Sequence, residues 1–285
     1  IQNDSLWERQ MELPHLGPSR LDALIKESIE FIYLHFRGET ADVAISGGKD
    51  STVLYWLTKE AKEKHPELEF RYHYLNTTID PPELVRFVRD EYPDVVELKA
   101  PPFFKMVRKR GFPLRTIRWC CNTQKKYVSN SKKTLTGVRA SESAARLLRG
   151  RIVQGDSHWN YNPIFHWQCG ERKGPNGERR FDIWDYIKDR GVRYCGLYDE
   201  GFLRLGCVVC PFITGSDKGT QARQKQHMER WPKYWEAFRR AFFDVWRRKA
   251  ETIEMYRNLP PETGWERWLL GGQIFDRPGD NAALE

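Results

Sequence analysis

Hydrophobic residues recur at two different spacings in the first half of the chain. In residues 20–37 they recur every three or four positions and a glycine ends the run, which predicts an amphipathic helix. Four short apolar runs predict strands, at residues 42–46, 71–77, 94–100 and 134–140. Helical patterns separate them, at residues 52–64, 81–92 and 101–111. Strands that alternate with helices indicate an α/β fold, with a parallel sheet that carries helices on both faces.

The pattern changes after residue 150. A stretch rich in glycine and charge at residues 170–180 predicts a surface loop, and residues 182–191 predict a short helix. Further on, aromatic residues recur at helical spacing, at Trp231, Trp235, Phe238, Phe242 and Trp246. Such a stripe is typical of a buried packing face, although exposed aromatic residues can also stack on nucleic-acid bases. The sequence therefore predicts a helical C-terminal extension.

Composition narrows the class of protein. Of the 285 residues, 40% are hydrophobic and 13% aromatic, which suffices for a packed core and excludes a disordered chain. No apolar run approaches the ~20 residues of a membrane span, and the first ten residues are polar rather than a secretory signal. A cytoplasmic location without membrane contact is expected, and with it six reduced cysteines rather than a disulfide framework.

Positive charge is concentrated in one stretch. Residues 99–151 contain 15 lysines and arginines and a single acidic residue, Glu142, so this stretch carries +14. The whole chain carries +8, which leaves −6 for the remainder. A surplus of this size is typical of a surface that binds a polyanion, either a nucleotide or a nucleic acid. A solvated basic surface without a ligand is the alternative.

The strongest local signal is the hexapeptide Ser46–Ser51, which lies between a predicted strand and a predicted helix. Its two glycines allow a tight turn that presents backbone N–H groups to an anion, at the positive end of the helix. Lys49 adds a point charge and the two serines add hydroxyl donors. The spacing of a Walker loop is absent. The hexapeptide resembles the SGGxDS signature of the PP-loop ATP pyrophosphatases, which cleave ATP, bound with Mg²⁺, between its α and β phosphates.

Further segments extend the resemblance to the phosphoadenylyl-sulfate (PAPS) reductase-like proteins of this superfamily, whose fold is adenine nucleotide alpha hydrolase-like. They lie in the expected order, at residues 75–77, 137–143, 162–164, 182–187 and 198–211. The resemblance implies that Asn76 and Thr77 lie near the adenine and ribose, and that Gly137 and Arg139 lie near the phosphates. The expected nucleotide-binding residues are Ser46, Gly47, Gly48, Lys49, Asp50, Ser51, Asn76, Thr77, Gly137 and Arg139. Ser46, Lys49, Asp50 and Arg139 are expected to act in catalysis.

Four cysteines form a second candidate site. Cys120 and Cys121 are adjacent, and two residues separate Cys207 from Cys210. Four thiolates can bind either zinc or an iron–sulfur cluster. Adjacent cysteines strain a mononuclear tetrahedral site but can reach two corners of a larger cubane. The set resembles that of adenylyl-sulfate reductases, which implies a [4Fe–4S] cluster; zinc and unliganded cysteines stay open as alternatives.

The sequence differs from the sulfonucleotide reductases in one feature that decides which function we predict. Sulfonucleotide reductases carry a catalytic cysteine near the C-terminus, whereas no cysteine follows Cys210 in this sequence. The remaining features resemble the sulfur-transfer proteins of DNA phosphorothioation systems (DndC and SspD type). This resemblance implies an ATP pyrophosphatase/sulfurtransferase that adenylates a DNA backbone phosphate and inserts sulfur. It also implies a cysteine desulfurase as sulfur donor, DNA as a partner, and contacts with other proteins of the modification system.

Three alternative functions stay open. The first is a tRNA thiolation enzyme, with tRNA as the partner, and the second is a PAPS or adenylyl-sulfate reductase-like protein. The third is a non-catalytic nucleotide-binding module with a zinc site. Cys169 and Cys195 are expected to be structural thiols, with a persulfide on either as the alternative. The predicted divisions are an N-terminal helical segment (1–38), a nucleotide-binding and cluster domain (39–215) and the helical extension (216–285).

Overall fold

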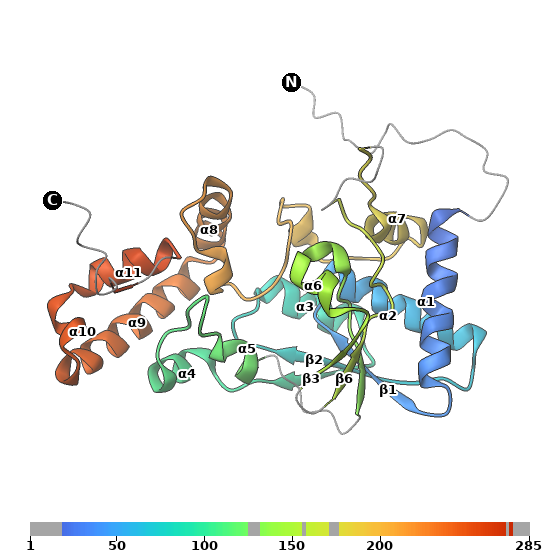
Figure 1. Cartoon of the computed structure of the whole chain (residues 1–285), viewed down its shortest axis with the longest axis horizontal. Helices are drawn as coiled ribbons and strands as arrows, with labels where there is room; N and C mark the ends of the chain where they lie inside the picture. Colours follow the sequence, from blue (N-terminus) through green and yellow to red (C-terminus); the bar gives the residue numbers. More distant parts are fainter. Residues whose placement is uncertain (1–18, 125–131, 156–157, 171–176, 272–273, 276–285) are drawn as a thin grey trace.

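The computed structural model describes residues 19–124, 132–155, 158–170, 177–271 and 274–275 (Figure 1). Residues 1–18 of the predicted N-terminal segment lie outside these ranges, as do residues 125–131 of the basic stretch and residues 171–176 of the predicted surface loop. Within the described ranges, no helix combines the length and the apolar character that a membrane span requires.

A mostly parallel sheet forms the centre of the first half of the molecule. Within the described ranges it has six strands in the order β3-β2-β1-β4-β6-β5. Neighbouring strands are parallel except β5 and β6, which are antiparallel. The strands are β1 (Thr40–Ile45), β2 (Glu69–Asn76), β3 (Val95–Lys99), β4 (Lys133–Leu135), β5 (Ile152–Gln154) and β6 (Trp159–Tyr161). The predicted α/β class is confirmed.

Helices on the sheet form the first hydrophobic core. Helices α1, α2 and α7 contact one another and bury their apolar faces with residues of β1, β2 and β4. Ser19 caps α1 reciprocally with Asp22, which satisfies two backbone donors at the helix start. Helix α2 begins at Lys49, earlier than predicted, because Gly48 is its N-cap. The helices of this half are α1 (Arg20–Phe36), α2 (Lys49–Lys64), α3 (Pro82–Glu91), α6 (Ala144–Arg149) and α7 (Asp182–Asp189).

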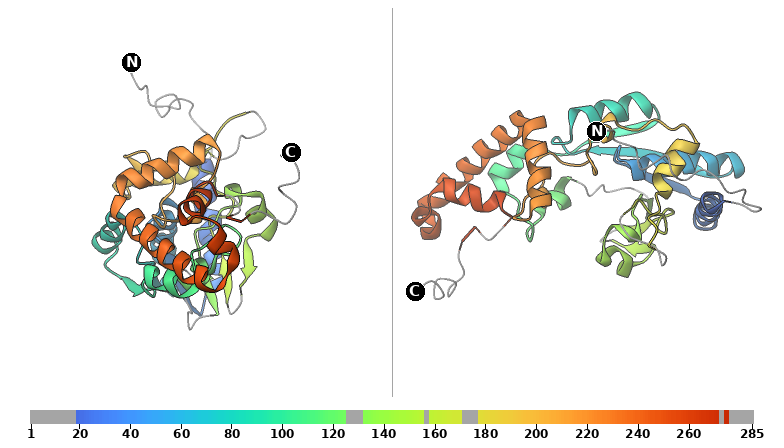
Figure 2. Two further views of the ribbon diagram at one scale, coloured as in Figure 1. Left: turned by 90° about the vertical axis from the view of Figure 1, so that its left-hand side faces the viewer. Right: turned by 90° about the horizontal axis from the view of Figure 1, so that it is seen from above.

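A second hydrophobic core joins the middle of the chain to its end. Figure 2 shows α4 beside the C-terminal helices, and α9 packs against α4, α8, α10 and α11. The predicted aromatic stripe from Trp231 to Trp246 is buried here, so it is a packing face. Phe87 of α3 packs against both cores. The helices are α4 (Phe103–Arg110), α5 (Trp119–Gln124), α8 (Lys218–Arg230), α9 (Pro232–Thr252), α10 (Glu254–Asn258) and α11 (Pro261–Leu269).

The described ranges also contain three short 3₁₀ helices, η1 (Ala140–Glu142), η2 (Gly196–Tyr198) and η3 (Pro211–Ile213). The helical C-terminal region is confirmed, and it encloses α4 and α5 from the middle of the sequence. The predicted domain limits at residues 38 and 215 stay predictions.

Candidate functional site

The strand order places two loops next to each other at one edge of the sheet. β1 and β4 are neighbours although they are not consecutive in the parallel series, so the order of strands reverses between them. In open α/β sheets, ligands bind at such a switch point, beyond the carboxyl ends of the strands. The loop after β1 contains Ser46, and the segment after β4 contains Gly137. A Cβ atom on Gly137 would lie 3.1 Å from the backbone of Asp50, so glycine permits this approach.

Hydrogen bonds inside the hexapeptide fix its backbone. The N–H of Ser46 donates to the Ser51 Oγ at 3.1 Å, and that hydroxyl donates to the carbonyl of Gly48 at 2.9 Å. The hydroxyls of Ser46 and Ser51 are 3.0 Å apart. Gly47 has φ +72°, and a Cβ there would lie 2.6 Å from the Val88 side chain. The loop is therefore a preformed turn at the N-terminus of α2, where backbone N–H groups favour anions.

Two cations surround the carboxylate of Asp50. The Arg139 Nε donates to its Oδ1 at 2.7 Å, and the Lys49 Nζ lies 3.2 Å from its Oδ2. Arg139 is only 1% exposed, and it also donates to the Ser141 Oγ at 2.8 Å. Its backbone N–H donates to Glu142, whose carboxylate pairs with Arg146 and Arg204 as well. Arg139 thus ties the segment after β4 to the hexapeptide, and its predicted contact with nucleotide phosphates stays a prediction.

Tyr198 is a residue of this site that sequence reasoning missed. Its hydroxyl accepts a hydrogen bond of 2.9 Å from the backbone N–H of Lys49, in the first turn of α2. The ring packs edge-on against Trp184, with centroids 5.1 Å apart, and burial raises the pKa of the phenol. A neutral hydroxyl therefore lies where the helix N-terminus would attract a phosphate oxygen. The contact joins residues 149 positions apart, so it leaves no local sequence pattern. The resemblance of residues 198–211 to a family segment was the only indication that Tyr198 belongs to the site.

An open cleft of about 1660 Å³ lies beside the hexapeptide. Lys49, Tyr198, Arg204 and Cys169 contribute to its lining. Cys195, in contrast, is buried, and burial raises the pKa of its thiol. Of the two cysteines outside the predicted cluster, Cys169 is therefore the one that faces the cleft. A persulfide on either stays a prediction.

The segment after β2, the strand that pairs with β1, contacts the loop that carries Cys207. The Asn76 side chain donates to Glu97 at 2.9 Å and accepts from the backbone of Thr78 at 2.8 Å. The thiol of Cys207 lies 3.7 Å from the Thr77 Oγ1. The backbone N–H of Val208 donates to the carbonyl of residue 79 at 2.9 Å. Asn76 and Thr77 thus hold this turn in place; their predicted contact with the nucleotide stays a prediction.

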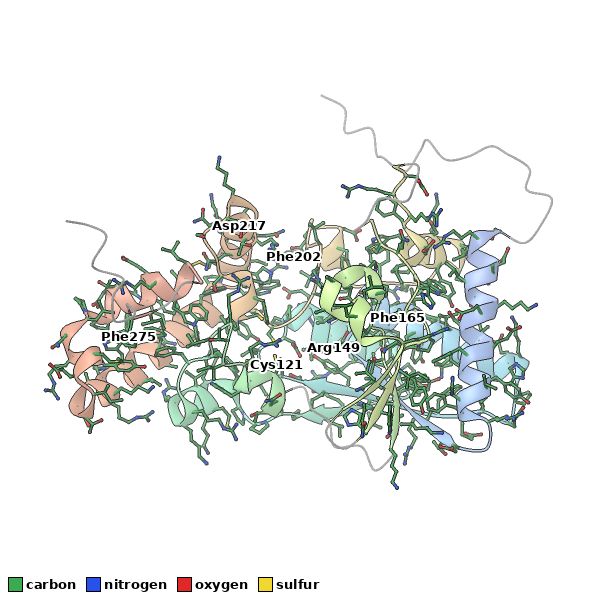
Figure 3. All side chains as sticks on the ribbon, in the orientation of Figure 1. Cys121, Arg149, Phe165, Phe202, Asp217 and Phe275 are labelled. Carbon is green, nitrogen blue, oxygen red and sulfur yellow. The ribbon has the colours of Figure 1, made fainter. Side chains whose placement is uncertain are left out.

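Cys207 and Cys210 lie near enough to Cys120 for their charges to act on it, and Figure 3 shows Cys121 at the junction between the sheet and the helical region. The thiols of Cys120 and Cys121 are within hydrogen-bonding distance, and the nearby thiols of Cys207 and Cys210 add their charge. Hydrogen bonding to Cys121, burial and these charges raise the pKa of Cys120. Four clustered thiols are a donor set that fits zinc or an iron–sulfur cluster. In the described part of the chain, however, no three His, Cys, Asp or Glu side chains surround a single ion position.

Comparison with known proteins places the chain among nucleotide-binding enzymes. An uncharacterized protein of Methanocaldococcus jannaschii is 29% identical over 68% of this chain and 39% of its own length. The adenosine 5'-phosphosulfate reductase of Neisseria meningitidis serogroup B is 31% identical over 46% of this chain and 50% of its own length. The chain therefore spans half or less of the length of these relatives.

One solved structure and one family profile also match part of the chain. The solved structure of Candida glabrata FMN adenylyltransferase with ATP covers 70% of this chain and 65% of that chain, with 16% identity and a TM-score of 0.48. The profile of the phosphoadenosine phosphosulfate reductase domain matches residues 40–212, which include the hexapeptide and all four clustered cysteines. The chain therefore belongs to the phosphoadenosine phosphosulfate reductase domain family, an enzyme family in which ATP binding is typical.

Proposed function

We propose that this protein is an ATP-dependent sulfurtransferase that activates an oxygen atom of a nucleic acid and replaces it with sulfur. The observation that carries the proposal is the preformed hexapeptide turn at the switch point of the sheet, beside an open cleft, with the segment after the neighbouring strand β2 in contact with the loop that carries Cys207. This arrangement supports a nucleotide at the turn and a sulfur donor near the cysteines.

The first step is the transfer of AMP. The acceptor oxygen attacks the α-phosphorus of ATP, the bond to the β-phosphate breaks, and pyrophosphate leaves. The Lys49 ammonium, which lines the cleft, and the positive end of α2 would stabilise the charge that develops on the departing pyrophosphate, because they are fixed in place before the reaction. Arg139 holds Asp50 and the segment after β4 in register with the turn. Mg²⁺ bound by the nucleotide would neutralise further phosphate charge.

The second step replaces AMP with sulfur. A sulfide ion, supplied by a cysteine desulfurase and a reductant, attacks the activated phosphorus or carbon, and AMP leaves with the original acceptor oxygen. This exchange is redox-neutral. Cys120, Cys121, Cys207 and Cys210 would hold the [4Fe–4S] cluster, or zinc; a metal bound by three of them would keep an open position and could supply a Lewis acid for sulfide. The protein's own residues orient the two reactants, since Thr77 and residue 79 contact the loop that carries Cys207.

Two acceptors fit this chemistry. The basic stretch suits the phosphodiester backbone of DNA, which supports phosphorothioation of a backbone phosphate, with the other modification proteins as partners. The same stretch suits tRNA, where a base carbonyl oxygen would be exchanged. Mass spectrometry of nucleosides from cells with and without the gene separates them. A gene-dependent phosphorothioate dinucleotide supports the DNA acceptor and a gene-dependent thiolated base supports tRNA, whereas the absence of both contradicts the proposal.

Sulfonucleotide reduction is the second candidate, because the chain is 31% identical to a phosphosulfate reductase over 142 residues. In those reductases a cysteine near the C-terminus attacks the sulfonucleotide, and residues 211–285 of this sequence contain no cysteine. Sulfite release from adenylyl sulfate with a thiol reductant tests this directly. Sulfite release that requires Cys207 but no nucleic acid would favour the reductase, and its absence favours sulfur transfer.

A further inference from the structure

An exposed aromatic ring lies next to the cysteine group. Phe212 follows the Cys210–Pro211 pair in η3, and 43% of its surface is exposed. The guanidinium carbon of Arg118 lies 4.9 Å from the centre of the Phe212 ring, and that of Arg115 lies 5.8 Å from it. Both arginines belong to the loop between α4 and α5, so two segments distant in sequence build one surface. We call Arg115, Phe212 and Arg118 the aromatic–guanidinium surface.

The charges of this surface are not neutralised by carboxylates. Within the described ranges, neither Arg115 nor Arg118 forms an ion pair, and both are exposed. Other exposed arginines differ, since Arg108 pairs with an aspartate at 2.9 Å and Arg230 contacts two glutamates. A ring flanked by two uncompensated guanidiniums attracts an anion that also carries a flat π-system. A nucleotide has both features, in its phosphate and its base.

We propose that the aromatic–guanidinium surface binds an unstacked base of a single-stranded or locally opened nucleic acid. The inference rests on the proposed function and specifies its substrate. The base stacks on Phe212, while Arg115 and Arg118 contact the adjacent phosphates. Lys105 and Lys109 of α4 are also exposed and extend the positive charge along the strand.

The position of the surface gives it a role beside the cysteines. Phe212 is two residues from Cys210, and Arg118 is two residues from Cys120, so a base held here lies beside the two segments that carry the cysteines. Bases in an intact duplex are already stacked on their neighbours, and only an unstacked or extruded base can reach a side chain in this way. The surface therefore favours single strands, loops and opened sites over regular duplex.

Binding measured without ATP tests the inference separately from turnover. Labelled single-stranded DNA and RNA of one sequence, and the corresponding DNA duplex, are titrated against the full chain at about 0.1 M salt. Both single strands are expected to bind more tightly than the duplex, and the tighter of the two identifies the sugar preference. Phe212→Ala should weaken single-strand binding roughly 10-fold, because one stacked base is lost. Phe212→Trp should restore it, which excludes a misfolded loop as the cause.

Trp56→Ala is the matched control. Trp56 is 39% exposed, similar to Phe212, but the two arginines that line its cleft are paired with Glu60 and Glu91, so no uncompensated guanidinium flanks it there. This variant should bind single strands like the unchanged protein. Arg115→Gln and Arg118→Gln should each reduce the slope of log affinity against log salt by about one or slightly less.

Two results would overturn the inference: duplex binding as tight as single-strand binding, or equal affinities for Phe212→Ala and Trp56→Ala. The proposed function fails in a different way, by the absence of pyrophosphate release from a protein that still binds single strands. If the unchanged protein releases pyrophosphate but does not bind single strands, the proposed role of the aromatic–guanidinium surface is contradicted and the proposed nucleotide chemistry is not. The two readouts therefore distinguish the two failures.

Discussion

The nucleotide loop and the cysteine group are built in opposite ways. The loop is six consecutive residues whose serines and glycines bond to one another, and its shape is set within one turn of chain. The cysteine group joins Cys120 and Cys121 to Cys207 and Cys210 through a core that mixes the middle and the end of the sequence. The geometry of the hexapeptide is therefore set by local hydrogen bonds, whereas the arrangement of the cysteines depends on tertiary packing.

The largest expected effect falls on the cysteine group. Cys207→Ala should remove the bound metal from anaerobically purified protein, because a cluster loses one of its four ligands. Iron and sulfide in near-equal amounts, with broad visible absorption, are expected in the unchanged protein; one zinc per chain would select the zinc alternative. Cys195→Ala is the control and should keep the metal. Unchanged protein without bound metal would contradict the assignment.

Among changes at the hexapeptide and the segment after β4, Arg139→Ala should cause the largest loss in the free energy of unfolding. Breaking a buried ion pair costs about 3–5 kcal/mol when the partner stays buried. Asp50 is partly exposed and keeps Lys49, so a loss of about 3 kcal/mol in the free energy of unfolding is expected. Denaturant unfolding measures it, with Arg223→Ala on α8 as a more exposed control. A loss below about 1 kcal/mol would show that the pair does not hold the two loops together.

The two loop glycines should respond differently. Gly47→Ala forces a side chain into a positive-φ backbone and against Val88 and Leu84, which should cost about 2–4 kcal/mol and most of the ATP turnover. Gly48→Ala places its Cβ 3.4 Å from the Tyr198 hydroxyl with an ordinary φ, so stability should change by less than about 1 kcal/mol. Equal losses in the two variants would contradict the turn geometry.

The smallest expected effect is a pH dependence of stability, which comes from one buried histidine in the sheet and one in α8. Burial lowers the pKa of His73 in the sheet and of His227 in α8 below the ordinary value. The unfolded chain then binds protons first as pH falls below about 6.5, so the folded protein loses stability, by at most about 1.4 kcal/mol per pH unit for each histidine. The stability is present above that pH and falls until the folded histidines are protonated.

Unfolding measured between neutral and mildly acidic pH checks this dependence. His73→Asn and His227→Gln should each flatten part of the slope, whatever they cost at neutral pH. Slopes that stay unchanged in both variants would show that other groups control the acid response.

Features that depend on nearby residues could be predicted from the sequence. The first three strands, the helix at residues 20–36 and the loop at residues 46–51 follow local patterns, and the structure confirms these elements. The fourth strand ends at Leu135 rather than at residue 140, because the chain turns there so that Gly137 can approach Asp50. Helix α5 and the strands β5 and β6 were missed, since elements of three to six residues show little periodicity.

Contacts between distant segments could not be predicted. The Tyr198 hydroxyl reaches Lys49 through the tertiary fold, and Phe212 meets Arg118 only because η3 and the loop before α5 pack together. The spacing of the cysteines predicted a common site; the structure places Cys207 and Cys210 near Cys120, and in the described residues the four-ligand arrangement stays a prediction. It did not predict that α4 and α5 would join the C-terminal helices to build the surroundings of that site.

The most direct test of the proposed adenylation and sulfur transfer is to follow the acceptor oxygen into AMP. The protein is incubated with ATP, sulfide and a nucleic acid whose candidate acceptor oxygens carry ¹⁸O, and the AMP and pyrophosphate are analysed by mass spectrometry. We expect equal amounts of AMP and pyrophosphate, with ¹⁸O in the AMP and sulfur in the nucleic acid. The Gly47→Ala variant should form neither AMP nor pyrophosphate. ADP and phosphate as products, or AMP that contains oxygen from water alone, would contradict the proposed reaction.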